Sequence, residues 1–512
     1  MPQRTRTRYI KITIAILTLL MVAGVVAQLY FTHQVKEMLG KEIPQELHLS
    51  YDQLSTNVLL GKITLTEVSW KNSKENIAVQ AASVSISGLQ YIPLLQHGDI
   101  IVSNAEMTSP SITVHKKEKD TTSKKDKNGP SKSISINNFQ IHNGSFKLLE
   151  APSDSIITLQ QIEFTLSDIH FDQETAAEKI PFTYGDYSFQ TKNGYYDLGP
   201  LEHIKFEQLQ LSPDDGEISG FTLQTKYSKD ELSKRLAFEH DHYDLSVQKI
   251  SLNQWNYGIE GNLPFFHLEK LQLQSPSFHV YRDKLLPDDV SHKKIYNQAL
   301  RDLKMDLQVD SITISKGLIT YEERLEADVA PENLSFTQID ATINNLHTLG
   351  NGNITIAADA KLMDNGQLEF EWEFDPQSKS NDFLAKGSLT NFESESITPF
   401  LKTNLNAEVS GTIQQMYFTI SGNELESQGD MKMKYDNFEF TVLKKDRLGV
   451  NKLLTAVVNL FTKDGNKTDD DGFRHGDFKV ERRQDKSFFN YLWINLKEGL
   501  VHTMTGRGKK RD

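Results

Sequence analysis

The stretch SPSITVHKKEK, residues 109–119, returns in altered form as SPSFHVYRDK at residues 275–284, 166 residues further along the chain. The passage that follows it is also repeated, because ISINNFQIHNGSFKLLE (134–150) is similar to LQVDSITISKGLITYEE (307–323). The order of the matches is kept, and the offset grows only to 177, as loop insertions would produce. We therefore predict a duplicated array of elements, about 170 residues per copy, that stack on one another. The last matched series is Leu159, Ile162, Leu166 and Ile169 against Phe336, Ile339, Ile343 and Leu346.

Hydrophobic and polar residues alternate through both copies, as in KITLTEVSW (62–70) and DSITISKGLITYEE (310–323). Such alternation places apolar side chains on one face of a strand and polar side chains on the other. Turn-forming pairs such as Asn-Gly and Asp-Gly separate about 25 strands of this kind. Convincing helical patterns lie only at the two ends of the chain.

A large sheet with one apolar face must cover that face or curve around it. Hydrophobic residues make up only 38% of the chain, which leaves little material for a second layer. We therefore expect a mainly β fold: an elongated, curved antiparallel β-groove built from repeats, with an N-terminal transmembrane helix and short terminal helices. A groove with an apolar lining suits an elongated apolar ligand.

Four residues of the second copy are the candidates for lining this groove. Leu271 and Leu273 share one face of a strand because they are two residues apart, and so do Ile312 and Ile314. The alternation does not show which face of the sheet is concave.

Composition excludes several classes of function. The net charge of -13 disfavours a broad nucleic-acid-binding surface, and the absence of cysteine excludes disulfides and thiolate chemistry. Phosphate-binding loops, dinucleotide fingerprints, nucleophile elbows and zinc-protease motifs are also missing. His240 and His242 are interpreted as a polar turn, and the acidic run 464–472 as a loop without the spacing of an EF-hand. We therefore expect no enzyme, no metal and no cofactor.

The N-terminus is typical of a membrane anchor. Four basic residues precede an uncharged run from Ile12 to Phe31, which is long enough for a hydrocarbon core of about 30 Å. The positive flank places the start of the chain in the cytoplasm and predicts a single-pass protein with most of the chain on the far side of the membrane. A signal peptide cleaved near Ala27 is the alternative. The basic residues are Arg4, Arg6, Arg8 and Lys11.

The expected organisation has four parts. Residues 1–31 form the cytoplasmic start and the anchor, and residues 32–230 form the first repeat array. The second array covers residues 231–380, and a C-terminal region covers residues 381–512. A lysine-rich run at 116–132 interrupts the first array and is interpreted as a solvated loop.

The stretch SFFNYLWINLKEGLVHTM (487–504) predicts an amphipathic helix. One interpretation is a helix packed on the end of the sheet. The other is a surface that touches a membrane or a partner protein, beside a basic tail at 507–511. The contact candidates for this second interpretation are Tyr491, Trp493, Leu496 and Leu500.

Several stretches resemble AsmA-like proteins, which are related to the AsmA/TamB group. LSYDQLSTNVLLGKITLTEVSW (49–70) follows the anchor as in that family. The C-terminal third contains LTNFESESITPFL (389–401), VSGTIQQMYFTISGN (409–423) and SQGDMKMKYDNFEFTVLKK (427–445). LLTAVVNLF (453–461) and FFNYLWINLKEGL (488–500) complete a similarity that covers residues 45–70 and 385–505.

The resemblance implies a repeating β-groove in the envelope of a bacterium with two membranes, with the anchor in the inner membrane and most of the chain in the periplasm. It also implies a role in phospholipid transport or outer-membrane assembly, with outer-membrane or other envelope proteins as further partners. We therefore expect a protein that binds phospholipid acyl chains in its groove. The alternative is a structural scaffold that binds other envelope proteins.

Overall fold

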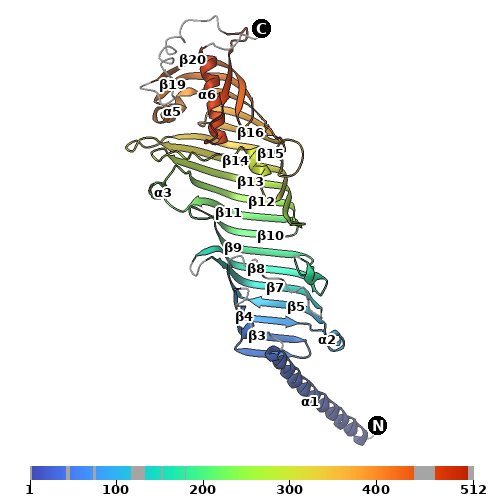
Figure 1. Ribbon diagram of the computed structural model, residues 1–512. Helices are drawn as coiled ribbons and strands as arrows, with labels where there is room; N and C mark the ends of the chain where they lie inside the picture. The colour runs from blue at the N-terminus through green and yellow to red at the C-terminus, as the bar shows by residue number, and fades with distance from the viewer. Residues whose placement is uncertain are drawn as a thin grey trace. The chain divides into compact units, whose positions relative to one another are not determined.

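The computed structural model describes residues 3–41, 47–72, 76–116, 133–150, 154–178, 180–442 and 468–505. Side chains are described from Leu20 onward. Strands account for 59% of the chain and helices for 16%, so the fold is mainly β, as predicted. Within the described residues, the strands belong to one mixed sheet of 21 strands. The chain divides into two compact units (Figure 1). Of the lysine-rich run 116–132, which was predicted to be a loop, residues 117–132 lie outside the described residues.

Unit 1 comprises residues 1–197 and 206–213. Its helices are α1 (Gln3–Lys41) and α2 (Tyr91–Gln96), with a 3-10 turn at Thr175–Ala177. Its strands are β1 (Leu47–Ser50), β2 (Gln53–Asn57), β3 (Lys62–Asn72), β4 (Ile77–Ser87), β5 (Ile100–Thr108), β6 (Ser111–His115), β7 (Ile134–Leu149), β8 (Ser155–Phe171) and β9 (Tyr187–Asp197).

Unit 2 comprises residues 198–205 and 214–512, and β10 (Glu202–Leu211) is divided between the units. Its helices are α3 (Lys229–Arg235), α4 (Tyr296–Arg301), α5 (Thr398–Leu405) and α6 (Phe488–Thr505), with a 3-10 turn at Ser394–Ile397. Its strands are β11 (Asp215–Thr225), β12 (His242–Glu260), β13 (Leu263–Asp283), β14 (Asp306–Arg324), β15 (Asn333–His347), β16 (Ile354–Leu362), β17 (Gly366–Phe374), β18 (Phe383–Glu393), β19 (Ala407–Gly422), β20 (Glu426–Val442) and β21 (Arg474–Glu481).

The expected antiparallel sheet is instead mixed. β5 and β6 both pair with β7 in parallel, and β13 pairs with β14 in parallel. Each parallel pair is joined by a long connection, residues 116–133 in unit 1 and 284–305 in unit 2, since parallel neighbours need a crossover. Alternation reports which way side chains point and does not report the direction of the neighbouring strand, so the sequence could not reveal this.

Short helices also occur away from the two ends of the chain, contrary to expectation. The clearest is α3, which begins with a capping box in which the Ser228 hydroxyl accepts from the backbone N–H of Glu231 and the Glu231 carboxylate accepts from the backbone N–H of Ser228. Its short length left no periodicity to detect, although Ser-x-x-Glu is a recognisable start signal.

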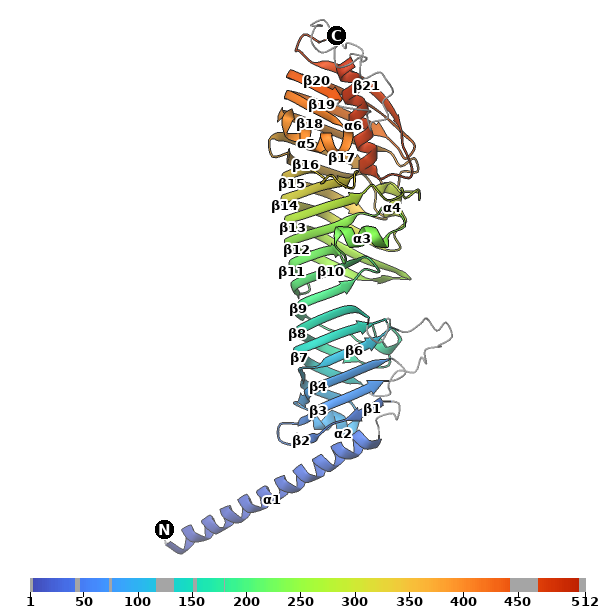
Figure 2. The ribbon, with the colours of Figure 1, turned by 90° about the vertical axis from the view of Figure 1, so that its left-hand side faces the viewer.

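The predicted duplication is confirmed by the strand registers. Ser111, the third residue of the first repeated phrase, lies opposite Ser145 in the parallel pair β6–β7. The corresponding Ser277 lies opposite Leu318 in the parallel pair β13–β14. Both positions follow the offsets found in the sequence, so the two phrases occupy equivalent places. Figure 2 shows the two arrays from the side.

An irregularity in the strand pairing is duplicated as well. The register shifts at Gly144, which pairs with Ile162, and again at Gly317, which pairs with Ile339. Immediately before each glycine, a backbone N–H donates to a carboxylate of the next strand, at 2.7 Å in unit 1 and 3.0 Å in unit 2. The donors are Asn143 and Lys316, and the acceptors are Glu163 and Asp340.

Left-handed residues bend the strands of both arrays at equivalent positions. In β15, Gln338 and Asn345 have φ of 51° and 56°, a conformation that only a few per cent of non-glycine residues adopt. Such irregularities bend a strand and increase its twist. The equivalent pairs, all with φ between 48° and 71°, are Gly88 and Gln254, Ser109 and Ser275, Asn143 and Lys316, Gln161 and Gln338, and Asp168 and Asn345.

The bends keep the hydrophobic residues on one face of each strand. Across each left-handed residue, the spacing of the apolar side chains changes from two residues to three. Four apolar residues of β15 therefore pair in turn with the apolar side of β14. The pairs are Phe336 with Ile319, Ile339 with Gly317, Ile343 with Ile312, and Leu346 with Val309. We call this side of the sheet the apolar face.

The largest core lies at the C-terminal end of unit 2, where α6 packs on the apolar face of the last strands (Figure 1). A smaller cluster of Leu268, Val309 and Ile312 lies on β13 and β14. Among the residues whose side chains are described, no helix has an apolar stretch long enough to cross a membrane. The first eight residues of the predicted anchor run, residues 12–19, lie outside this set.

Candidate hydrophobic groove

The structure brings the four predicted groove residues together on the apolar face of unit 2. Leu271 of β13 lies opposite Ile312 of β14, and Leu273 lies opposite Ile314. The first pair belongs to a row that runs from Leu252 of β12 to Ile343 of β15. The second belongs to a parallel row that begins at Ile250 and ends at Ala341.

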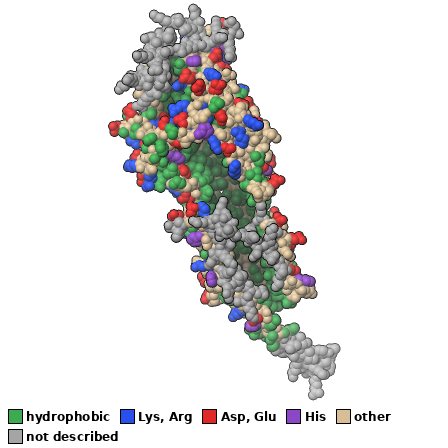
Figure 3. Space-filling model, in the orientation of Figure 1, with side chains coloured by type: hydrophobic (Ala, Val, Ile, Leu, Met, Phe, Trp, Pro, Cys, Tyr) green, Lys and Arg blue, Asp and Glu red, His purple; other side chains and the backbone are tan. Residues whose placement is uncertain are grey.

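These rows are only partly covered. Ile312 is buried, at 7% exposed, but Leu271, Leu273 and Ile314 are half-buried. Farther along β14, Ile319 is 39% exposed. Figure 3 shows hydrophobic side chains gathered in a hollow over the part of unit 2 that contains β11 to β14. Within the described residues, this stretch of the apolar face thus remains open to an apolar ligand.

The opposite face of the same strands is polar. Gln272 lies between Leu271 and Leu273 and is exposed, and its neighbours across the sheet are Ser251 and Thr313. Because β-strand side chains alternate in direction, this face turns away from the hollow. The structure therefore determines which side of the sheet could hold hydrocarbon.

Unit 1 carries equivalent rows that the sequence analysis did not single out. Val84, Met107, Ile141 and Phe164 pair in succession from β4 to β8. The Phe164 ring makes edge contacts with two neighbouring phenylalanines at centroid distances of 6.2 and 6.3 Å. The repeat offsets place Ile141 at the position of Ile314 and Met107 at that of Leu273, so these offsets alone could have identified them.

Helix α6 closes the apolar face at its C-terminal end. Phe488 is 3% exposed, stacks on Trp372 at a centroid distance of 4.5 Å and meets the edge of Phe383 at 5.1 Å. The row through Ile343 continues through Ile356 to Trp372, so the same face passes from open hollow to filled core.

This packing corrects part of the predicted contact surface. Tyr491 is 1% exposed, and its burial raises the pKa of the phenol to about 12. It contributes to the core and is not a surface contact. Leu496 and Leu500 are also partly buried against the core, whereas Trp493 remains 37% exposed. The interpretation of a helix packed on the sheet is therefore confirmed for most of these residues.

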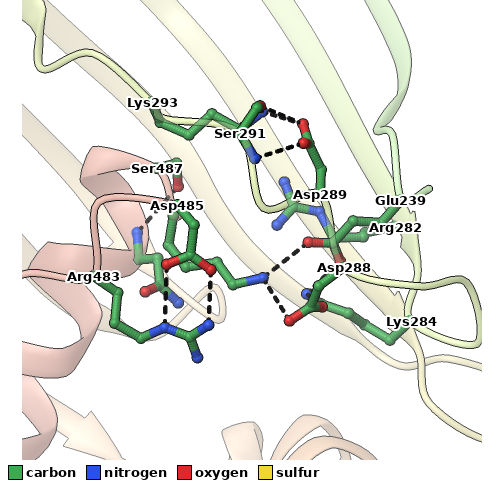
Figure 4. Close-up of polar contacts among 12 residues, drawn as sticks. Glu239, Arg282, Lys284, Asp288, Asp289, Ser291, Lys293, Arg483, Asp485 and Ser487 are labelled. Atoms are coloured by element: carbon green, nitrogen blue, oxygen red, sulfur yellow. Dashed lines mark hydrogen bonds and ion pairs between the residues drawn. The ribbon is translucent and has the colours of Figure 1, made fainter.

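A cluster of charged side chains, largely buried except for Asp288, holds the chain in place just before α6 (Figure 4). The Lys486 ammonium lies 3.0 Å from carboxylate oxygens of both Glu239 and Asp288, and Lys284 lies 2.6 Å from Glu239. Burial alone would lower the pKa of Lys486, but the bonds to Asp288 and Glu239 outweigh it and raise the pKa. The hydrogen bond from Lys486 likewise lowers the pKa of Asp288. We call these four residues the Lys486 cluster.

The Lys486 cluster joins three parts of unit 2. Glu239 precedes β12, Lys284 and Asp288 follow β13, and Lys486 precedes α6. Nearby, the Arg482 guanidinium donates to the backbone carbonyl of Lys293 at 2.6 Å, in the same crossover connection. The cluster thus holds α6 against the crossover between β13 and β14.

Removing one member of the Lys486 cluster is expected to destabilise unit 2. Glu239→Gln leaves two lysines without their shared buried carboxylate, so we expect a loss of about 3 kcal/mol in the free energy of unfolding. The matched control is Glu426→Gln, which breaks an exposed 2.7 Å pair with Lys479 and should change the free energy of unfolding far less, because water screens the pair. Urea unfolding of both variants measures the difference, and equal losses would contradict a structural role for the cluster.

The pH dependence of the cluster has a defined sign. The pKa of Asp288 is lower in the folded protein than in the unfolded chain. Its contribution to the free energy of unfolding is therefore complete above the ordinary aspartate pKa, and it is lost as the pH falls through the pKa of the folded state. For Lys486, whose pKa is raised, the contribution is lost at high pH instead.

The two histidines considered for a metal site take separate partners. His240 Nε2 lies 2.9 Å from a carboxylate oxygen of Glu202, whereas His242 Nε2 lies 3.0 Å from the backbone carbonyl of Tyr227. Among the residues that the structure describes, no group of three or more acidic or histidine side chains is arranged to hold a metal ion. Residues 464–467 of the acidic run lie outside this part of the chain.

No family model matches the chain, and no curated protein matches it. The function is therefore inferred from the geometry and chemistry of the residues described above.

Proposed function

We propose that this chain is a membrane-anchored protein of the bacterial envelope that binds lipid acyl chains along its apolar face. Through this binding it contributes to phospholipid transport or outer-membrane assembly. The observation that carries the proposal is the pair of apolar rows, one through Leu271 and Ile312 and the other through Leu273 and Ile314. Both rows cross four strands, and their side chains are half-buried except for the buried Ile312.

The chemistry of these rows fits hydrocarbon. Burial of each methylene group contributes about 0.8 kcal/mol, and the contribution is not directional. A continuous apolar strip across several strands therefore favours a long, flexible chain over a compact polar ligand. Such a strip selects the class of ligand and leaves the identity of the head group open.

The N-terminal helix α1 supports a location at the inner membrane. The basic flank and the uncharged run of α1 fit an anchor whose start lies in the cytoplasm. Leu20, Met21 and Val22 are between 54% and 73% exposed, as expected of residues that face lipid. The resemblance of two regions to AsmA-like proteins supports the same location and a role in lipid movement.

Photo-crosslinking tests the proposed occupant of the groove. A photoreactive amino acid in place of Leu273 or Ile314 should give adducts of phospholipid mass in the full chain purified from membranes. The matched controls, Gln272 and Thr313, lie on the opposite face and should give none. Protein adducts without lipid at Leu273 and Ile314 would instead support the scaffold function.

The anchor is tested separately. Deletion of residues 1–31 should move the exported chain from the membrane fraction to the soluble fraction, because the only long uncharged apolar run of the sequence is removed. Fractionation with a carbonate wash measures the change. A truncated chain that stays tightly membrane-bound would contradict a single anchor.

A further inference from the structure

Unit 1 exposes a set of large hydrophobic side chains where α1 meets the sheet. Leu59 and Leu60, at the turn between β2 and β3, are 92% and 62% exposed. Ile92 and Leu95, one turn apart on α2, are 69% and 82% exposed. We call these four residues the basal patch. An exposed apolar patch of this kind, on a turn and a neighbouring short helix, is typical of an interaction surface.

Both loops of the basal patch are tied to α1 by specific contacts. The Gln28 amide donates to the backbone carbonyl of Thr56 at 2.6 Å and accepts from the N–H of Val58 at 2.8 Å. On the other loop, the Tyr91 ring meets the edge of Phe31 at a centroid distance of 5.6 Å. The Tyr91 hydroxyl also donates to the carbonyl of Val58 at 2.6 Å, which joins the two loops to each other.

These contacts fix the position of the basal patch along the axis of α1. Gln28 lies three residues before Phe31, where the uncharged run ends, which is about 4.5 Å along a helix. If the run spans the hydrocarbon core, the patch lies level with the boundary between acyl chains and head groups. Leu29 and Tyr30, at the same level of α1, are 66% and 65% exposed, and tyrosine favours this boundary.

We propose that the basal patch is a membrane-contact surface, in which Leu59, Leu60, Ile92 and Leu95 insert into the lipid interface beside α1. This inference rests on the proposed membrane location of α1. Its occupant is lipid because the patch continues the apolar surface of the helix at the depth where that helix leaves the bilayer. The contact would hold the first strands of unit 1 against the membrane surface, where lipid could enter the apolar face.

Site-directed spin labelling tests the proposal, since the chain contains no cysteine that must first be removed. Leu59→Cys and Leu95→Cys are labelled with a nitroxide in the full chain, reconstituted in vesicles of phosphatidylethanolamine and phosphatidylglycerol. Val25→Cys on α1 is the membrane reference. Leu425→Cys, which is 56% exposed in unit 2, is the aqueous reference. The ratio of collision rates with oxygen and with a water-soluble nickel complex reports depth in the bilayer.

We expect the labels at residues 59 and 95 to show an oxygen-to-nickel ratio several-fold above that of residue 425. An aqueous ratio at both positions, with a membrane ratio at residue 25, would overturn the proposal and leave the anchor intact. If the labels at residues 59 and 95 show the oxygen-to-nickel ratio of residue 425 together with spin–spin broadening, the basal patch binds a second copy of the chain and the lipid contact is overturned. An aqueous ratio at residue 25 would overturn the anchor and this inference together, whereas lipid crosslinking at Leu273 reports the groove independently.

Discussion

Leu273→Asp and Ile314→Asp are expected to abolish lipid binding while leaving the protein folded. An unpaired carboxylate on a surface that must hold hydrocarbon costs about 3 kcal/mol or more when the ligand excludes water. That cost corresponds to a loss of at least about a hundredfold in affinity. Both side chains are only half-buried, so water can reach the charge in the empty protein and folding suffers less than binding does.

The matched controls are Gln272→Asp and Thr313→Asp, on the adjacent positions of the opposite face. They add the same charge to the same strands and should leave bound lipid unchanged. The measurements are lipid content by native mass spectrometry and the free energy of unfolding in urea. Equal loss of lipid on both faces, or unfolding by the first pair alone, would contradict an open groove and favour the scaffold function. Ile312→Asp is unsuitable because Ile312 is buried in the small cluster.

The sequence predicted the repeat well because a repeat is a direct property of the sequence. The offsets read from the two phrases reproduce the pairing of Ser111 with Ser145 and of Ser277 with Leu318. The shared face of Leu271 and Leu273 also followed directly, since side chains along a strand alternate.

The bends and the parallel pairs were not predicted, for two different reasons. The bends have a visible signal, the three-residue step from Leu252 to Trp255 and from Ile314 to Gly317, but a search for strict alternation passes over it. Parallel pairing has no such local signal, because it depends on how a connection crosses the sheet. The position of the α6 core likewise required knowing that Trp372 and Phe488, far apart in sequence, stack on each other.

The prediction of which side of the C-terminal helix is exposed was wrong in part, because apolar residues with helical spacing cover most of its circumference. Tyr491, Trp493, Leu496 and Leu500 were the candidates for contact with a membrane or a partner protein. The helix instead buries Phe488 and Tyr491, and it leaves Phe489 and Trp493 exposed. A helix that is hydrophobic over most of its surface does not show in its own sequence which side meets the sheet.

Phe488→Ala is expected to produce the largest loss of stability, about 3–5 kcal/mol in the free energy of unfolding. The substitution leaves a cavity between Trp372 and Phe383 and removes the contacts that seat the first turn of α6. Its control is the adjacent Phe489→Ala, which removes a ring that is 64% exposed and should change stability by about 0.5 kcal/mol or less.

Urea unfolding and protease sensitivity of α6 distinguish the two alanine variants. If α6 closes the groove, its release in Phe488→Ala should also extend the lipid-accessible face, so crosslinking should spread from Ile314 toward positions on β16 and β17. Equal stability of the two variants would show that α6 does not depend on this aromatic contact. Loss of stability without any spread of crosslinking would show that α6 does not limit the lipid-accessible part of the apolar face. In that case the helix only stabilises the core of unit 2.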